Sequence, residues 1–105
     1  MSTKEFLLAL PQRVHPDALT GHNTNFHFDV TGDNAGQYTV AVVDGKMNVQ
    51  EGLHGDPKCT IKAKESDLMG VVDGSINPMM AVMMGKLKIS NLGEMQKYAK
   101  AFGLM

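Results

Sequence analysis

Methionine is the residue type whose number and spacing say most about the chemistry open to this chain. Nine of the 105 residues are methionine, and most of them lie in the last third of the chain. A thioether side chain is unbranched, polarizable and adaptable, so a methionine cluster can pack against apolar molecules of varied shape. Methionine at helical spacing is also often ordinary filled core. The cluster comprises Met69, Met79, Met80, Met83, Met84, Met95 and Met105.

The other residues that could do chemistry form no catalytic or metal-binding pattern. The four histidines lack the paired spacing of zinc ligands, so we expect surface side chains. They are His15, His22, His27 and His54. Cys59 occupies an inward strand position, which predicts a buried structural thiol. The sequence also has no nucleophile elbow, carboxylate pair or glycine-rich phosphate loop. We therefore expect a protein that is not an enzyme and uses no metal and no cofactor.

Length and composition predict one globular domain over residues 1–105. Hydrophobic residues make up 43% and charged residues 20% of the chain, which is typical of globular proteins. The early apolar run at residues 6–10 is too short to cross a bilayer and follows Glu5, so we expect no membrane span or signal peptide. A single cysteine cannot form an internal disulfide, which agrees with a reducing compartment. These features together predict a cytoplasmic protein.

Charge is distributed unevenly between the two halves of the chain. The net charge of −1 gives no general attraction for nucleic acid. Residues 1–57 hold three basic and seven acidic side chains, whereas residues 58–105 hold seven basic and four acidic ones. The basic half is therefore also the methionine-rich half.

Hydrophobic periodicity predicts a helix at the start of the chain, followed by strands. Ser2 and Glu5 form a capping box that opens an amphipathic helix, which we expect to end or kink at Pro11. A second short helix is expected to run through Leu19 and end at Gly21. Four stretches with a period of two follow, at residues 25–31, 37–43, 46–50 and 58–64. We expect these strands to pair in sequence order as an antiparallel meander, in a sheet with one buried face and one solvent-exposed face.

The last part of the chain returns to helices around one further strand. A helix carrying Leu68 and Val71 is followed by the methionine helix, which begins at Asn77-Pro78 and ends at Gly85. Residues 86–90 read as a fifth strand, and Asn91 caps a terminal helix. The chain is therefore predicted to be α+β, with a five-stranded, mostly antiparallel sheet and about five helices covering one face.

Several sequence blocks in this order resemble the sterol carrier protein type 2 family. The blocks are DPKCTI at 56–61, DL at 67–68, GSINP at 74–78, Ala81 and GKLKI at 85–89. The resemblance extends from about residue 26 to residue 102. It implies a noncatalytic fold with a tunnel between sheet and helices that takes fatty acids, acyl-coenzyme A esters, sterols or phospholipids. The missing C-terminal Ser-Lys-Leu address and the short length favour a small freestanding bacterial member.

Two positions depart from the family pattern. Met84 stands where many members carry glutamine, which should make that part of a cavity less polar. Members of the family usually have a glycine between the last strand and the last helix, whereas here Ser90 is followed directly by Asn91. This difference should shift the terminal helix.

We expect an apolar lipid-binding cavity between the sheet and the C-terminal helices. Met83 is expected on the inward stripe of its helix, one turn from Met79 and Met80. The most expected ligand is a fatty acid or fatty acyl-coenzyme A, bound and transferred without catalysis. Two alternatives remain: a structural or interaction module whose methionines fill its core, and an accessory subunit of an acyl-coenzyme A enzyme. The expected lining residues are Val71, Met79, Met80, Val82, Met83, Met84, Met95 and Phe102.

Lysines occupy the outward positions of the fourth and fifth predicted strands. If the strands are neighbours, as in the family, the lysines form one basic face that could touch an anionic membrane or an acyl-coenzyme A enzyme transiently. The alternative is an ordinary solvated face that lysine keeps from edge pairing. No nucleic-acid partner is expected. The lysines are Lys58, Lys62, Lys64, Lys86 and Lys88.

Overall fold

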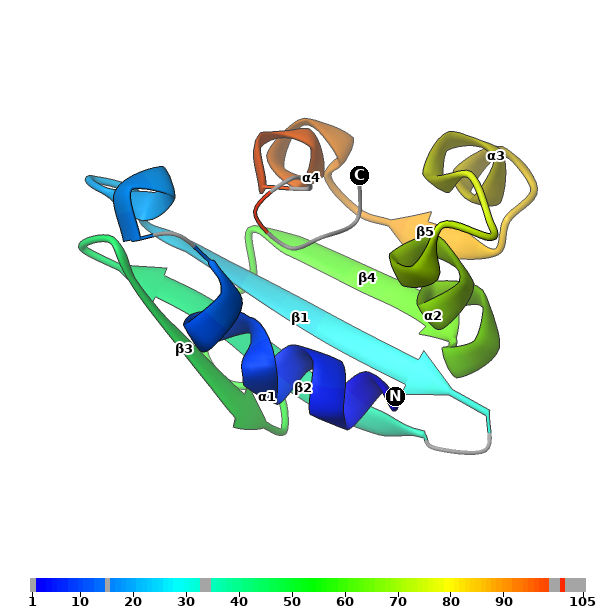
Figure 1. The fold of residues 1–105 in the computed structure, drawn as a ribbon, viewed down its shortest axis with the longest axis horizontal. Helices are drawn as coiled ribbons and strands as arrows, with labels where there is room; N and C mark the ends of the chain where they lie inside the picture. Colours follow the sequence, from blue (N-terminus) through cyan, green and yellow to red (C-terminus); the bar gives the residue numbers. More distant parts are fainter. Residues whose placement is uncertain (1, 15, 33–34, 99–100, 102–105) are drawn as a thin grey trace.

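A five-stranded sheet with helices on one side forms the framework of the protein (Figure 1). The structure is a computed structural model, and it describes residues 2–14, 16–32, 35–98 and 101. Four α-helices and one 3₁₀ helix, η1 (Pro16–Leu19), appear in the described part. The predicted α+β class and the mostly antiparallel sheet are confirmed.

Helix α1 (Thr3–Arg13) packs its apolar stripe against the sheet. The predicted capping box is present, because Ser2 Oγ accepts from the Glu5 amide and Glu5 Oε1 accepts from the Ser2 amide, both at 3.2 Å. The sequence predicted that the helix ends or kinks at Pro11, and in the structure it continues to Arg13. Proline has no N–H to donate, but the amide of Val14 still donates to Leu10 O at 3.0 Å.

Strands β1 (Thr24–Thr31), β2 (Gly36–Val43) and β3 (Lys46–Glu51) form the predicted antiparallel meander. Phe26 and Val40 are register partners on the inner face, and neither has exposed surface. The β2–β3 turn needs positive φ at both central residues, which are Asp44 at 51° and Gly45 at 79°. Aspartate and glycine tolerate these angles best, so the DG pair closes the hairpin as predicted.

Strand β4 (Cys59–Lys64) contradicts the expectation that the meander continues. It pairs in parallel with β1, with Phe26 opposite Cys59, which gives the sheet order β3-β2-β1-β4-β5. The β3–β4 connection therefore passes across the outer face of the sheet. There the amide of His54 donates to Thr39 Oγ1 at 2.9 Å, and His27 Nε2 donates to His54 O at 2.9 Å.

This crossing also corrects the expectation that every histidine lies on the surface. His27 and Thr39 point to the predicted wet face but are only 7% and 3% exposed, because the β3–β4 connection covers them. His22 and His54 are exposed as expected, and His15 lies outside the described residues. The alternation of apolar and polar residues therefore predicted which side chains point to the outer face, but not that the β3–β4 connection covers that face.

The last elements follow the predicted boundaries closely. Helix α2 (Glu65–Asp73) leads to α3 (Pro78–Met83), whose cap Asn77 accepts from the amides of Met79 and Met80 at 2.9 and 3.2 Å. Strand β5 (Leu87–Ile89) pairs antiparallel with β4 at the sheet edge, and α4 (Leu92–Tyr98) follows. No helix in the described part of the chain is long and apolar enough to cross a membrane.

Cys59 is expected to react slowly with a thiol reagent in the folded protein and quickly after denaturation. Its side chain has no exposed surface, and its Sγ donates to Asn91 O at 3.5 Å. Burial raises the pKa of the thiol, so the reactive thiolate is scarce at neutral pH. Ellman's reagent at pH 8, with and without urea, measures both rates. Rapid labelling without urea would contradict the inward register of β4.

Candidate functional site

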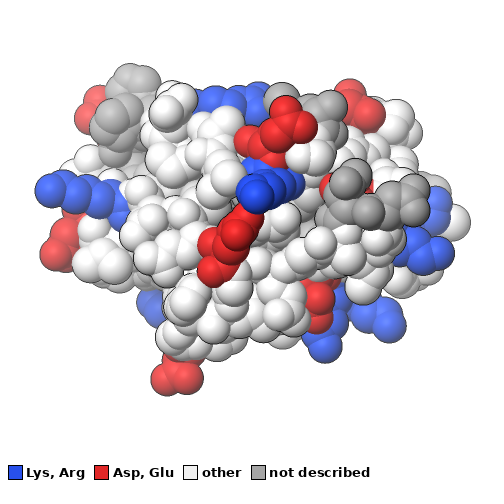
Figure 2. Space-filling view, turned by 90° about the horizontal axis from the view of Figure 1, so that it is seen from below, with Lys and Arg blue, Asp and Glu red and all other residues white. Residues whose placement is uncertain are grey.

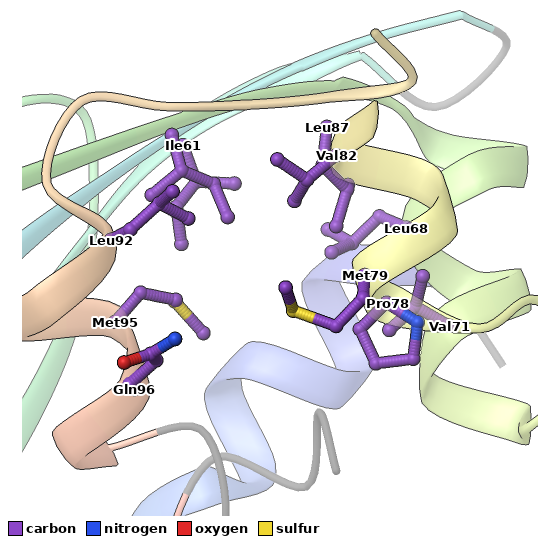
Figure 3. Close-up of a pocket in the computed structure, with 11 residues that line it drawn as sticks. Ile61, Leu68, Val71, Pro78, Met79, Val82, Leu87, Leu92, Met95 and Gln96 are labelled. Atoms are coloured by element: carbon purple, nitrogen blue, oxygen red, sulfur yellow. The ribbon is translucent and has the colours of Figure 1, made fainter. Parts of the chain in front are cut away.

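An apolar cavity lies between the inner face of β4 and β5 and the helices α2, α3 and α4 (Figure 3). Its volume is about 60 Å³. Among the described residues that line it, only Gln96 has a polar side chain, so these walls offer dispersion contacts and almost no hydrogen bonding. The lining residues are Ile61, Leu68, Val71, Pro78, Met79, Val82, Leu87, Ile89, Leu92, Met95 and Gln96.

Each wall of the cavity follows from the local structure of its element. Residues at alternate positions of a strand share a face, so Leu87 and Ile89 of β5 both point inward beside Ile61 of β4. Leu68 and Val71 lie one turn apart on α2 and form the floor on the helical side. The sheet and α2 supply branched side chains with few rotamers, which makes these walls comparatively stiff.

Helices α3 and α4 supply the adaptable side of the cavity. The side chains of Met79 and Met95 point toward one another across it from the two helices (Figure 3). Met95 is 6% exposed, whereas Met79 is 55% exposed, so the cavity opens to solvent beside Met79. Because methionine changes rotamer easily, these two residues can accept chains of different shape.

Half of the eight residues expected at the site do line this cavity. Val71, Met79, Val82 and Met95 are brought together there. The structure does not bring Met80 and Met84 to the cavity: their side chains are 56% and 63% exposed.

Met83 contradicts the expected inward stripe, since its side chain is 83% exposed. Helix α3 buries only Ala81, so the small residue faces the protein, whereas Met80, Met83 and Met84 are exposed outside the cavity. Phe102 lies outside the described residues.

Several lining residues were missing from the expected set, although their inward orientation could be predicted. The strand residues Ile61, Leu87 and Ile89 occupy inward positions of β4 and β5, and Leu68 lies on the same stripe of α2 as Val71. The expected set was drawn from the helices only, so it contained none of the inward strand residues. Pro78, Leu92 and Gln96 had no comparable signal in the sequence.

Helix α4 is joined by polar contacts to the first residue of β1 and to the segment just before that strand. Thr24 Oγ1 donates to Glu94 Oε2 at 2.6 Å, and His22 Nδ1 lies 3.0 Å from Tyr98 Oη. Burial raises the pKa of the Tyr98 phenol above its ordinary value. The Tyr98 ring also meets Phe26 edge to face, with 5.7 Å between centroids. These contacts place Met95 while its own neighbours in the cavity remain apolar.

Among the eleven lining residues that the structure describes, none has an acidic, basic or nucleophilic side chain. Within the described ranges, no three histidine, cysteine or acidic side chains gather closely enough to hold a metal ion.

Four of the five expected lysines line a groove on the outer side of β4 and β5. Lys62 and Lys88 are register partners on the two strands, and Lys64 and Lys86 lie beside them. The groove has a volume of about 570 Å³, and Asp67 is the one acidic side chain among its described lining residues. Lys58 lies apart, with its Nζ donating to Asn23 O at 3.0 Å.

Positive charge is not spread over the whole molecule. The face drawn in Figure 2 carries basic and acidic side chains side by side, with wide uncharged areas between them. The lysines of the basic groove lie together on β4 and β5 and the turn before β5.

Comparison with known proteins gives one family. The model described as the SCP-2 sterol transfer family matches residues 4–103. Sterol carrier protein 2 from Gallus gallus is 36% identical over 70 residues, which are 66% of this chain and 13% of the chicken protein. The Bos taurus protein of the same name is 36% identical over 66 residues, or 62% of this chain and 12% of its own. The chain thus spans about one eighth of the length of these relatives.

Solved structures of low sequence identity share the fold. The solution structure of palmitated SCP2L2 from Aedes aegypti aligns with a TM-score of 0.76 and 18% identity over 97% of this chain and 95% of that one. The sec-alkylsulfatase Pisa1 from Pseudomonas sp. aligns with a TM-score of 0.79 and 20% identity, covering all of this chain (100%) and 16% of the sulfatase. The same fold therefore occurs both as nearly a whole chain and as a small part of an enzyme.

Proposed function

Because the chain belongs to the SCP-2 sterol transfer family, we propose that it binds a long-chain fatty acid or fatty acyl-coenzyme A with the acyl chain in the α2–α3–α4 cavity. Membership of the family implies lipid or sterol binding in general terms. The proposed ligand class is narrower. The observation that carries it is the cavity itself, whose walls are apolar on every side apart from Gln96. Binding and release are sufficient for the role, and no bond is made or broken.

An acyl chain supplies enough driving force for useful affinity without polar contacts. At about 0.8 kcal/mol for each buried methylene, a chain of roughly sixteen carbons has a gross transfer free energy of about 12 kcal/mol. The loss of translational and rotational freedom on association reduces this favourable free energy by at least about 4 kcal/mol. The remainder of about 8 kcal/mol corresponds to a dissociation constant in the micromolar range.

The cavity must widen to admit such a chain. Its volume of about 60 Å³ is well below the roughly 300–1,000 Å³ of typical small-molecule pockets. Helix α3 is the element best suited to move, because it has six residues and buries only Ala81. The outward displacement of Met79 and Val82 with α3 would open the space toward β5. The palmitated mosquito relative, which has the same fold, supports an acyl ligand for this architecture.

We expect affinity to rise with acyl chain length. A fluorescent long-chain fatty acid should bind with a dissociation constant in the micromolar range, and saturated fatty acids should displace it better as methylenes are added. One added methylene changes affinity by at most about 1 to 3 kcal/mol, so the trend is best read over a series from about eight to sixteen carbons. Equal affinity across that series would contradict an acyl site. It would favour an interaction module with a filled core.

A further inference from the structure

Helix α3 presents methionine to solvent rather than to the protein core. We define the α3 patch as Met79, Met80, Met83 and Met84, whose side chains are 55%, 56%, 83% and 63% exposed. Leu92 of α4, at 42%, extends the same apolar surface across the cavity. The other large exposed apolar side chains that the structure describes, Leu8, Val43 and Leu53, lie on three different segments of the chain. Contiguous exposed apolar side chains of this kind mark an interaction site.

The α3 patch adjoins the opening of the apolar cavity. Met79 belongs to both, because its side chain lines the cavity and is also more than half exposed. Figure 3 shows Met79 at the edge of the cavity, facing Met95. The α3 patch therefore continues the apolar surface outward from the mouth of the cavity.

The α3 patch also adjoins the basic groove. Met84 caps α3, and Gly85, with φ of 76°, turns the chain directly into Lys86. The Lys86 amide donates to Ala81 O at 2.8 Å, which holds the start of β5 against the helix. Gly85 and Lys86 themselves line the groove with Lys62, Lys64 and Lys88. In the described part of the chain, no carboxylate lies within 4.0 Å of these four amines.

We propose that the α3 patch and the basic groove together dock the protein on an anionic lipid bilayer. Two interactions hold a protein on such a surface: apolar side chains enter the membrane interface, and basic side chains attract anionic headgroups. The methionines of the α3 patch supply the first, and the lysines of the basic groove supply the second. The adjoining cavity favours a bilayer over a protein partner, because a lipid then passes between membrane and cavity beside Met79 without crossing water. This route of exchange rests on the proposed lipid-binding function. The docking itself does not.

The test is cosedimentation with vesicles of phosphatidylcholine alone and of phosphatidylcholine mixed with phosphatidylserine. The first variant is the double substitution Met83→Gln with Met84→Gln, at exposed positions outside the cavity. The second is Lys86→Gln with Lys88→Gln. Matched controls are Leu8→Gln on α1, 44% exposed, and Lys46→Gln on β3 at the opposite edge of the sheet.

The parent protein should bind mixed vesicles, and the methionine variant should bind them about tenfold more weakly at any salt concentration. The lysine variant should lose binding mainly at low salt, because the headgroup attraction is screened beyond a Debye length. Both controls should bind like the parent. Fatty-acid binding without vesicles should be unchanged in the methionine variant, since neither residue lines the cavity.

Equal binding of the parent and both double variants would overturn the proposal. So would a parent dimer in sedimentation velocity that the methionine variant abolishes while vesicle binding stays unchanged, since the patch would then be an interface between copies. Vesicle binding that depends on the patch, in a protein that binds no free fatty acid, would support docking and reject the lipid-binding function separately.

Discussion

Val82→Phe is expected to lower the affinity for a long-chain fatty acid by about tenfold or more, with little change in the stability of the lipid-free protein. Val82 is partly buried and lines the cavity. A phenyl ring at this position would occupy the cavity of about 60 Å³ that the acyl chain must enter. Enlarging a side chain in a filled core typically costs about 1–3 kcal/mol, so a change below about 1 kcal/mol in unfolding free energy indicates available space. Fluorescent fatty-acid titration and urea denaturation measure the two quantities.

Met83→Phe is the matched control on the same helix. Its side chain is 83% exposed and lies outside the cavity, so affinity for free fatty acid should not change and stability should stay within about 0.5 kcal/mol. The site is contradicted if Val82→Phe destabilises the protein strongly while the parent shows no melting shift with oleate. That combination would mean that α3 packs on a filled core.

Phe26→Ala is expected to lower the free energy of unfolding by about 3–5 kcal/mol, as for other large-to-small changes of aromatic core residues. Phe26 is 0% exposed and lies on β1, the central strand between β2 and β4. Its ring centroid is 6.5 Å from that of Phe28 and 5.7 Å from that of Tyr98. Because small domains are stable by only about 5–15 kcal/mol, the variant should unfold at much lower urea concentration.

Leu8→Ala provides the comparison for that loss. Leu8 is 44% exposed on α1, so its removal should change stability by no more than about 0.5 kcal/mol. A decrease of less than about 1 kcal/mol in the unfolding free energy of Phe26→Ala would show that Phe26 of β1 does not lie at the centre of the core. Circular dichroism during urea unfolding measures both variants on the same scale.

The sequence predicts which segments form strands and which of their side chains point inward. It does not predict which strands lie next to one another. Phe26, Phe28 and Cys59 all occupy the buried positions that alternation predicts. Alternation is the same for parallel and antiparallel pairing, so it did not reveal that β4 crosses to the far side of β1. The crossing depends on outer-face hydrogen bonds from His54 to Thr39 and from His27 to His54, which local pattern does not encode.

The orientation of α3 is the main part of the site that sequence reasoning missed. The helix is apolar around its whole circumference, so its pattern predicts a helix but gives no preferred inward face. The structure turns Ala81 toward the protein, which allows close approach of the backbone, and leaves Met83 outside. On α2 and α4, where polar residues occupy the opposite side, the inward residues Val71 and Met95 were identified.

Methionine methyl NMR tests the proposed acyl site most directly. In protein labelled with ¹³C at the methionine methyl groups, palmitate should shift the signals of Met79 and Met95, which face one another across the cavity. Both methyl groups should also show nuclear Overhauser contacts to the acyl chain, while exposed Met83 should show no such contacts. Unchanged Met79 and Met95 signals at saturating palmitate, or changes confined to Met83 and Met84, would contradict lipid binding in this cavity.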